Sequence, residues 1–111
     1  MTGKTLRRRR RWIRRRQQVR TLLAQLRSAG ACQLCGEDDP LVLDFHHVAP
    51  ATGKRFTIGS FGRRSVSAVR AEVCKCALIC ANCHRRVNAG TIDASGLSPL
   101  ALPGAALVAA P

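Results

Sequence analysis

The stretch CALICANCHRRVNAG, residues 76–90, decides how this chain folds. It opens on an apolar run, which predicts a short strand over residues 77–79, and passes directly into a helix predicted over residues 81–89. Gly90 follows as the expected stop of that helix. The junction between strand and helix carries two cysteines in the spacing C-x-x-C, Cys80 and Cys83. A strand-to-helix junction with two thiols at this spacing predicts a metal knuckle.

A second C-x-x-C pair, in the predicted turn CQLCG (32–36), is separated from the first by 44 intervening residues. The two thiolates of a pair can bind one tetrahedral ion, and four thiolates together favour zinc. The long loop between the pairs adds little entropic cost, because that cost grows only logarithmically with length. A redox role is disfavoured, since no thioredoxin-like βαβ pattern surrounds either pair. We therefore predict a structural Zn²⁺ site formed by Cys32, Cys35, Cys80 and Cys83.

Two cysteines are left over. Cys76 is expected to pack beside Leu78 as a small apolar residue, and Cys74 to have a structural or incidental role.

The composition predicts a small intracellular domain whose fold needs the support of a metal site. The chain has 111 residues, 4% of them aromatic, which leaves material for only a modest core. No apolar segment of a secretory signal follows the basic N-terminus, and the apolar tail over 97–111 is too short and too rich in proline to span a membrane. We expect a cytoplasmic protein without a membrane span, where thiols stay reduced and available to a metal.

The positive charge is concentrated at one end of the chain. The net charge is +13, and residues 1–27 hold eleven of the nineteen lysines and arginines and no acid. Such a run predicts a nucleic-acid partner, whose phosphates it would contact without reading sequence, although a solubilising or targeting arm is the alternative. The arginines that we expect to contact the phosphate backbone are Arg7, Arg8, Arg9, Arg10, Arg11, Arg14, Arg15 and Arg16.

Further helices and a strand are predicted from periodicity. Residues 4–29 form a helix with an apolar face at Val19, Leu22, Leu23 and Leu26, ended by Gly30. The arginine-rich part, 7–16, is expected to be helical only on a phosphate backbone, because like charges one turn apart repel. Residues 41–47 read as a strand, 50–53 as a loop and 55–58 as a short extended piece. Ser65 is the expected N-cap of a helix that runs to about residue 75, and residues 91–111 are expected to form a flexible tail.

Three histidines accompany the predicted zinc site. His46 and His47 end the predicted strand, and His84 directly follows Cys83, with Asn88 one helical turn later on the same face. Neighbouring strand residues point to opposite sides, so one of the doublet would be a ligand and the other a base. His84, Asn88 and one histidine of the doublet are thus candidates to bind a second metal ion. A histidine base, an activated water and a metal ion suit phosphodiester hydrolysis. The alternative is that the histidines are extra zinc ligands or surface residues.

The motifs LDFHHV (43–48), P-x-x-G-K (50–54) and CKCALICANCHRRVNAG (74–90) together resemble the HNH endonucleases. The resemblance covers residues 30–90 and is closest to the small zinc-knuckle type found in bacteriophages and mobile elements. It implies a ββα-metal fold, similar to a treble-clef finger, in which a two-stranded hairpin packs on a helix above structural zinc. It also implies a bacterial host cell.

The resemblance assigns roles to residues of this chain. His47 matches the general base, while His46 and His84 match ligands of a catalytic divalent ion. Relatives commonly have a histidine where this chain has Asn88, whose amide oxygen suits Mg²⁺ or Mn²⁺. Many relatives have asparagine where this chain has Lys75, so a backbone carbonyl is the candidate to orient His47. Further phosphate contacts are expected from Lys54, Arg55, Arg85 and Arg86.

The prediction is therefore a small zinc-stabilised α+β domain in three parts: a basic N-terminal helix or arm over 1–29, a nuclease domain over 30–90 and a tail over 91–111. The predicted activity is metal-dependent hydrolysis of DNA, with double-stranded DNA favoured. Two alternatives stay open. One is a catalytically inactive zinc module that binds DNA, and the other is an accessory subunit for phage DNA packaging.

Overall fold

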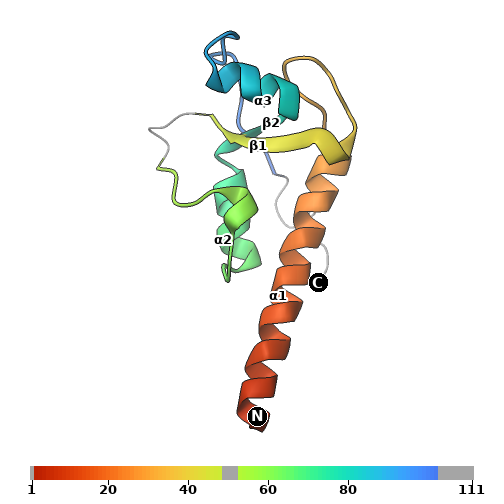
Figure 1. Cartoon of the computed structure of the whole chain (residues 1–111), viewed down its shortest axis with the longest axis vertical. Coiled ribbons are helices and arrows are strands. Elements are labelled where there is room, and N and C mark those ends of the chain that lie inside the picture. Colours follow the sequence, from red (N-terminus) through yellow and green to blue (C-terminus); the bar gives the residue numbers. More distant parts are fainter. Residues whose placement is uncertain (1, 49–52, 103–111) are drawn as a thin grey trace.

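The computed structural model describes residues 2–48 and 53–102 of the chain. In this part the chain is a small α+β fold, in which a two-stranded antiparallel sheet lies between a short helix, α3, and two helices on the other side, α1 and α2 (Figure 1). Helix α1 extends far beyond the sheet, and the molecule is accordingly elongated, with a longest dimension of 54 Å. No helix in the described ranges is both long and apolar enough to cross a membrane.

Helix α1 covers Gly3–Ser28 without a break. Thr2 caps its start by accepting a hydrogen bond from the Thr5 N–H at 3.2 Å. The predicted apolar face is confirmed, since Val19, Leu22, Leu23 and Leu26 are all buried. The arginine-rich part is helical in the protein itself, which corrects the expectation that it needs a phosphate backbone. Arginine is a good helix former, and the packed second half supplies the nucleus from which the first half extends.

Strands β1 (Leu43–His47) and β2 (Cys76–Cys80) form the sheet, with Leu43 opposite Cys80 and His47 opposite Cys76. Strand β1 begins two residues later than predicted. The preceding Pro40–Val42 forms a 3₁₀ turn instead, held by the Asp39 carboxylate, which accepts from the Leu41 N–H at 3.0 Å. Alternation along β1 sends Leu43, Phe45 and His47 to one face, and Asp44 and His46 to the other. The histidine doublet is therefore divided between the two faces of the sheet.

Helices α2 (Val66–Val73) and α3 (Ala81–Asn88) form where the sequence predicted helices. The Ser65 hydroxyl caps α2 by accepting from the Ala68 N–H at 3.2 Å. Helix α3 ends as expected at Gly90, which has a φ of +76°. The Gly90 N–H donates to the Val87 carbonyl and the Thr91 N–H to the Arg86 carbonyl, each at 3.0 Å. This pattern is the Schellman motif, and it satisfies carbonyls that would otherwise be left open at the helix end.

Gly30 has a different role from the one expected. Helix α1 is capped by Ala29, and Gly30 does not have a positive φ. Its importance is spatial, because a Cβ atom on Gly30 would lie 2.6 Å from Cδ1 of the buried Leu78. The glycine lets the end of α1 approach strand β2 closely.

The segment over 91–102 packs against the domain, contrary to the expected unpacked tail. Leu97 is buried, and the Leu100 N–H donates to the Cys76 carbonyl at 2.8 Å. The Gln33 side chain donates to the Ser98 carbonyl and accepts from the Ser98 N–H. The rest of that tail, 103–111, and most of the loop predicted over 50–53 lie outside the described residues. The predicted extended piece over 55–58 is not a strand; Ile58–Ser60 forms a 3₁₀ turn.

The buried residues form two clusters. The first joins the apolar face of α1 to Val69 and Val73 of α2 and to Cys76. The second lies around the cysteine pairs and contains Leu43 and the middle of β2. Phe45 and Leu100 pack against both clusters. The second half of α1 is thus part of the same core as the sheet.

Candidate functional site

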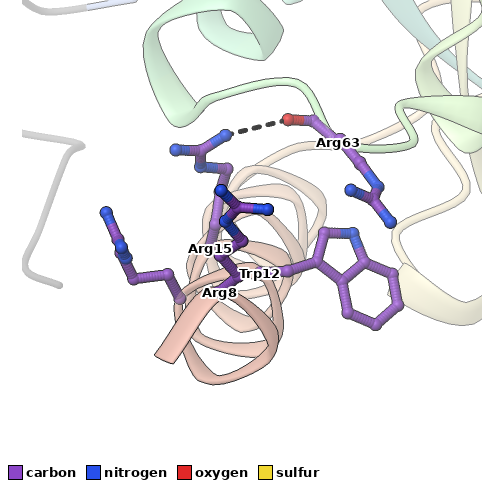
Figure 2. A pocket seen from close by; sticks show the side chains of 5 residues that line it. Arg8, Trp12, Arg15 and Arg63 are labelled. Atoms are coloured by element: carbon purple, nitrogen blue, oxygen red, sulfur yellow. Dashed lines mark hydrogen bonds between the residues drawn. The ribbon is translucent and has the colours of Figure 1, made fainter. Parts of the chain in front are cut away.

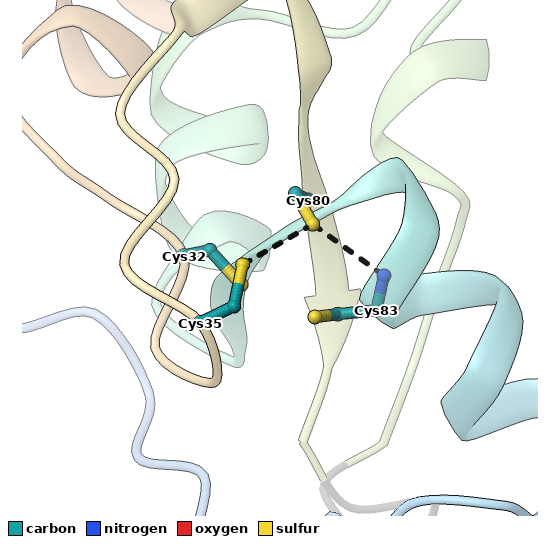
Figure 3. Close-up of side chains that lie close together, drawn as sticks. All are labelled: Cys32, Cys35, Cys80 and Cys83. Carbon is teal, nitrogen blue, oxygen red and sulfur yellow. Dashed lines mark hydrogen bonds between the residues drawn. The ribbon is translucent and has the colours of Figure 1, made fainter.

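The two C-x-x-C pairs meet at one end of the sheet (Figure 3). Cys32 and Cys35 lie in the turn that follows α1, Cys80 ends β2, and Cys83 lies in the first turn of α3. The four sulfur atoms all lie within 4.8 Å of one another, and the Sγ atoms of Cys35 and Cys80 are 3.6 Å apart. Sulfurs bound tetrahedrally at about 2.3 Å from zinc would be roughly 3.8 Å apart. The four cysteines are therefore placed to hold one metal ion, consistent with structural zinc.

Local hydrogen bonds fix the two knuckles. Cys80 caps α3, since its Sγ accepts from the Cys83 N–H at 3.4 Å. In the other knuckle the Gln33 N–H donates to the Leu78 carbonyl at 3.0 Å, which ties the turn to β2. The ligand positions thus depend on both turns and on the strand between them.

The charges of the four thiols also fit a cation. Burial favours the neutral Cys32 thiol, but backbone N–H groups around it outweigh that effect and lower its pKa to about 6. Burial and then the neighbouring cysteines raise the pKa of Cys83 to about 12. Four ionised thiols this close would repel one another, so a bound cation is what allows all of them to ionise.

The two remaining cysteines behave differently from each other. Cys76 is fully buried in the first core cluster, and burial followed by the nearby Glu72 carboxylate raises its pKa to about 12. This agrees with the expected role as a small apolar residue. Cys74 is exposed at the end of α2.

His47 forms a pair with an acidic residue that was not predicted. Its Nε2 atom lies 2.8 Å from Oε2 of Glu72, and the side chains of His47 and Glu72 are 11% and 2% exposed. A proton on Nε2 donates to the carboxylate and leaves Nδ1 free to accept another proton. The sequence suggested a backbone carbonyl as the orienting group; in the structure it is a carboxylate.

Glu72 is held by three donors at once. The Arg55 N–H donates to Oε2 at 3.0 Å and the Lys75 ammonium to Oε1 at 2.9 Å, in addition to the histidine. Burial alone would raise the pKa of Glu72, but these hydrogen bonds and the Lys75 charge outweigh it and lower the pKa to about 2. The carboxylate is therefore ionised at neutral pH although it is buried. Lys75 is one of its partners.

A signal for Glu72 is present in the sequence. It is the only acid between Asp44 and Asp93, and it falls beside Val69 and Val73 on the face of α2 that turns to the core. An isolated carboxylate at a buried position requires partners, and His47 and Lys75 are among the few residues able to supply them.

His46 and His84 meet on the opposite face of the sheet. Their ring centroids are 5.2 Å apart in an edge-to-face arrangement. The Nδ1 atom of His84 lies 3.0 Å from Oδ2 of Asp44, which shares the sheet face with His46. A hydrogen bond from Nδ1 leaves Nε2 of His84 available as a metal ligand. Burial, followed by the electrostatic influence of the nearby His84, His47 and Lys54 side chains, lowers the pKa of His46, which favours the neutral ring that a metal needs.

The other residues expected at the site lie around this cluster. Asn88 is exposed at the end of α3, one turn after His84, and Lys54, Arg85 and Arg86 are exposed as well. Within residues 2–48 and 53–102, the four cysteines are the only His, Cys, Asp or Glu group whose ligand atoms converge as a metal site. His46, His84 and Asp44 are thus neighbours that would have to move closer to bind an ion together.

No protein-family model, curated protein or solved structure matches the chain.

Proposed function

We propose that this protein is a metal-dependent HNH-type endonuclease that hydrolyses phosphodiester bonds of DNA. One observation carries the proposal: the two neighbouring histidines of β1 have different partners. His47 pairs with a buried carboxylate, whereas His46 faces His84 of α3. A base and a metal-binding set are the two components that this hydrolysis requires, and one residue step along a strand separates them.

His47 is the general base of the proposal. Its bond to Glu72 fixes the orientation of the ring and holds the proton on Nε2, as a carboxylate does for the base of a catalytic triad. The free Nδ1 atom then takes a proton from the attacking water. Because Glu72 is ionised through its three donors, it remains able to stabilise the protonated imidazole that forms.

His46, His84 and Asn88 are the proposed ligands of the catalytic divalent ion, Mg²⁺ or Mn²⁺. A bound ion would neutralise the charge that develops on the leaving oxygen. Asp44 would act through His84 as a positioning residue, because its hydrogen bond to Nδ1 turns Nε2 toward the ion. The antiparallel pairing of β1 with β2, with α2 between them in the chain and α3 directly after β2, supports a ββα-metal fold with the four cysteines as its zinc site.

The proposal is tested by incubating the purified chain with supercoiled plasmid and Mg²⁺ or Mn²⁺. His47→Ala should lower the nicking rate roughly 10²–10⁴-fold, the usual contribution of a general base. Zinc content and the circular dichroism spectrum should stay unchanged, since the substitution leaves the four cysteines in place. Equal nicking by both proteins, or none by either with any divalent ion, would sink the proposal.

Helix α3 offers a matched pair of asparagines for the metal site. Asn82 and Asn88 are both exposed on this helix, but only Asn88 lies one turn after His84. Asn88→Ala should raise the Mg²⁺ concentration for half-maximal nicking by about tenfold or more, while Asn82→Ala should leave it unchanged. The same requirement in both variants would remove Asn88 from the ligand set.

One observation favours a second candidate, a catalytically inactive zinc module that binds DNA. His46, His84 and Asp44 do not converge as a metal site, and Asn88 stands where relatives commonly have histidine. Retention of DNA in band shifts, with no cleavage under any metal condition, would support this candidate. Nicking that appears only when a phage DNA-packaging protein is added would instead support an accessory role in packaging.

A further inference from the structure

The first half of α1 has a side that faces the domain. Trp12 is half-buried there, with the guanidinium groups of Arg16 and Arg63 over its ring at 5.4 and 5.8 Å from the centroid. Arg15 donates to the Arg63 carbonyl at 3.2 Å, so the loop before α2 is tied to the helix (Figure 2). A hollow of about 270 Å³ between them is lined by Trp12 and four arginines. We call this contact the Trp12 brace; it fixes the direction in which α1 leaves the domain.

The side turned away from the brace has a different pattern. Successive helix residues are about 100° apart, so Leu6, Ile13 and Gln17 fall on one edge of α1. This edge lies on the far side of the helix from the arginines that line the hollow, Arg8, Arg11 and Arg15. All three are exposed, Leu6 by 40% and Ile13 by 41%. Leu6 and Ile13 are, together with Leu41, the exposed large apolar side chains of the described chain.

Arginines flank this edge on both sides. By the same spacing, Arg9 and Arg16 lie on one side of it, and Arg10 and Arg14 on the other. Like charges three and four residues apart repel, and the chain provides no acid before Glu37 to compensate them. Such a helix gains stability when a polyanion supplies negative charge on both of its sides.

From this pattern we infer that the first half of α1 inserts into the major groove of double-stranded DNA. The groove of B-DNA is about 12 Å wide and admits one helix, with a phosphate chain along each side. The two arginine rows would face the two phosphate chains, and Leu6, Ile13 and Gln17 would face the base edges. Apolar side chains contact the thymine methyl group there, and glutamine can pair with adenine. The inference deepens the proposed function, because it names the form of the nucleic acid and the way it is held.

Other polyanions fit the pattern less well. The major groove of double-stranded RNA is deep and narrow, so that side chains cannot read it. A membrane surface would require a continuous apolar face, whereas this edge has two apolar residues. A contact on the outside of a duplex would use one arginine row and leave the other in solvent.

The test measures binding of the full chain carrying His47→Ala to a duplex of about 20 base pairs, by fluorescence anisotropy at several salt concentrations without added divalent ion. Each phosphate contact contributes about 0.9 to the slope of log affinity against log salt. Arg9→Gln should lower the slope by about 0.9 and Arg10→Gln/Arg14→Gln by about 1.8, while Arg16 is left in place because it also lies over the Trp12 ring. Arg70→Gln on α2 is the control and should leave the slope unchanged. A slope that falls when one side of the edge is changed and not when the other side is changed would overturn insertion.

The edge residues give a second, independent readout. Ile13→Ala/Gln17→Ala should weaken binding severalfold and reduce the preference among duplex sequences, with an unchanged salt slope, because no charge is removed. Unchanged affinity in this variant, or equal affinity for double-stranded RNA, would overturn the inference. Since the assay needs no cleavage, a protein that shows the expected binding but never nicks DNA would support this inference and contradict the nuclease.

Discussion

Glu72 is the residue on which most of the site depends. Its carboxylate joins β1 through His47, the loop before α2 through the Arg55 N–H, and the turn between α2 and β2 through Lys75. A buried carboxylate is costly unless it is fully hydrogen-bonded, and here the donors come from three different parts of the chain. The site and the fold are therefore coupled through a single side chain.

Glu72→Gln should lower the free energy of unfolding by about 3 kcal/mol at pH 7, because each unit of pKa shift corresponds to about 1.36 kcal/mol and the pKa falls from 4.5 to about 2. The folded state binds fewer protons than the unfolded state in this range, so the contribution is complete above pH 4.5 and is lost as pH falls toward 2. Urea unfolding of both proteins should therefore give a difference that shrinks below pH 4.5. A difference that stays constant with pH would show that the ionised carboxylate does not stabilise the fold.

The same substitution tests the role of Glu72 as a positioning residue. If His47 is the base, Glu72→Gln should lower the nicking rate and change its pH dependence, because the amide no longer holds the proton on Nε2. The Mg²⁺ requirement should stay the same, since the ligands lie on the other face of the sheet. Glu72→Asp retains the charge and should restore part of the rate. A uniform loss in both variants, with the wild-type pH profile, would indicate a purely structural role.

For individual residues, the sequence predicted which side chains belong to the candidate site better than it predicted what those side chains contact. His46, His47 and His84 were recognised from their spacing to the cysteines, and the structure does bring His46 and His84 together. The Glu72 pairing depends on how α2 packs against β1, which is a tertiary contact between residues 25 apart. Local patterns in the sequence do not specify such a contact.

Among the glycines of the described chain, Gly30 is the one whose position leaves least room for a Cβ atom. The end of α1 reaches β2 only because position 30 has no Cβ atom. Leu78 is 2% exposed in the second core cluster and has little space to move away.

Gly30→Ala should therefore destabilise the protein by about 1–3 kcal/mol, the usual cost of an added group in a packed core. Combining it with Leu78→Val, which removes the contacting methyl group, should recover part of that loss in a double-mutant cycle. Thermal unfolding of the wild-type protein, the two single variants and the double variant would provide the four free energies of unfolding. Simple additivity of the two substitutions would contradict the close contact as the reason for the glycine.

The secondary structure was largely predictable, because caps, periodicity and helix stops are local signals. Two of the segments that differ from the expectation show where local signals are insufficient. Repulsion between the arginine charges was expected to keep the arginine-rich run from forming a helix without a phosphate backbone. In the structure the run continues a helix whose second half is packed in the core. Residues 91–102 have no periodicity. Leu97 is nevertheless part of the second core cluster, and Leu100 packs against both clusters.

Over the whole molecule, the two core clusters differ in what supports them. The first is built from helices α1 and α2, whereas the second surrounds the four cysteines. The zinc that we expect there would thus support mainly the second cluster, the turn after α1 and helix α3.

Removal of zinc by a strong chelator should therefore expose the backbone amides of β2 and α3 to hydrogen exchange much more than those of Val19–Leu26 in α1. Elemental analysis should give one zinc per chain, and Cys83→Ser should give less than one. Cys74→Ser is the matched control, because Cys74 is exposed at the end of α2 and is not one of the four clustered cysteines, and it should leave both the zinc content and the exchange unchanged. Uniform loss of protection over both clusters would show that they unfold as one unit.

The unbroken course of α1 also has a mechanical consequence. Sixteen residues of this helix precede the buried half, which at about 1.5 Å per residue corresponds to a lever of roughly 24 Å. The Trp12 brace ties the middle of the helix to the loop before α2, and the buried half continues into the turn that carries Cys32 and Cys35. A sideways force on the tip would thus be carried by the brace and the core together. If DNA binds to this helix as proposed, the length of DNA shielded from a chemical footprinting reagent should extend further to one side of the histidines than to the other.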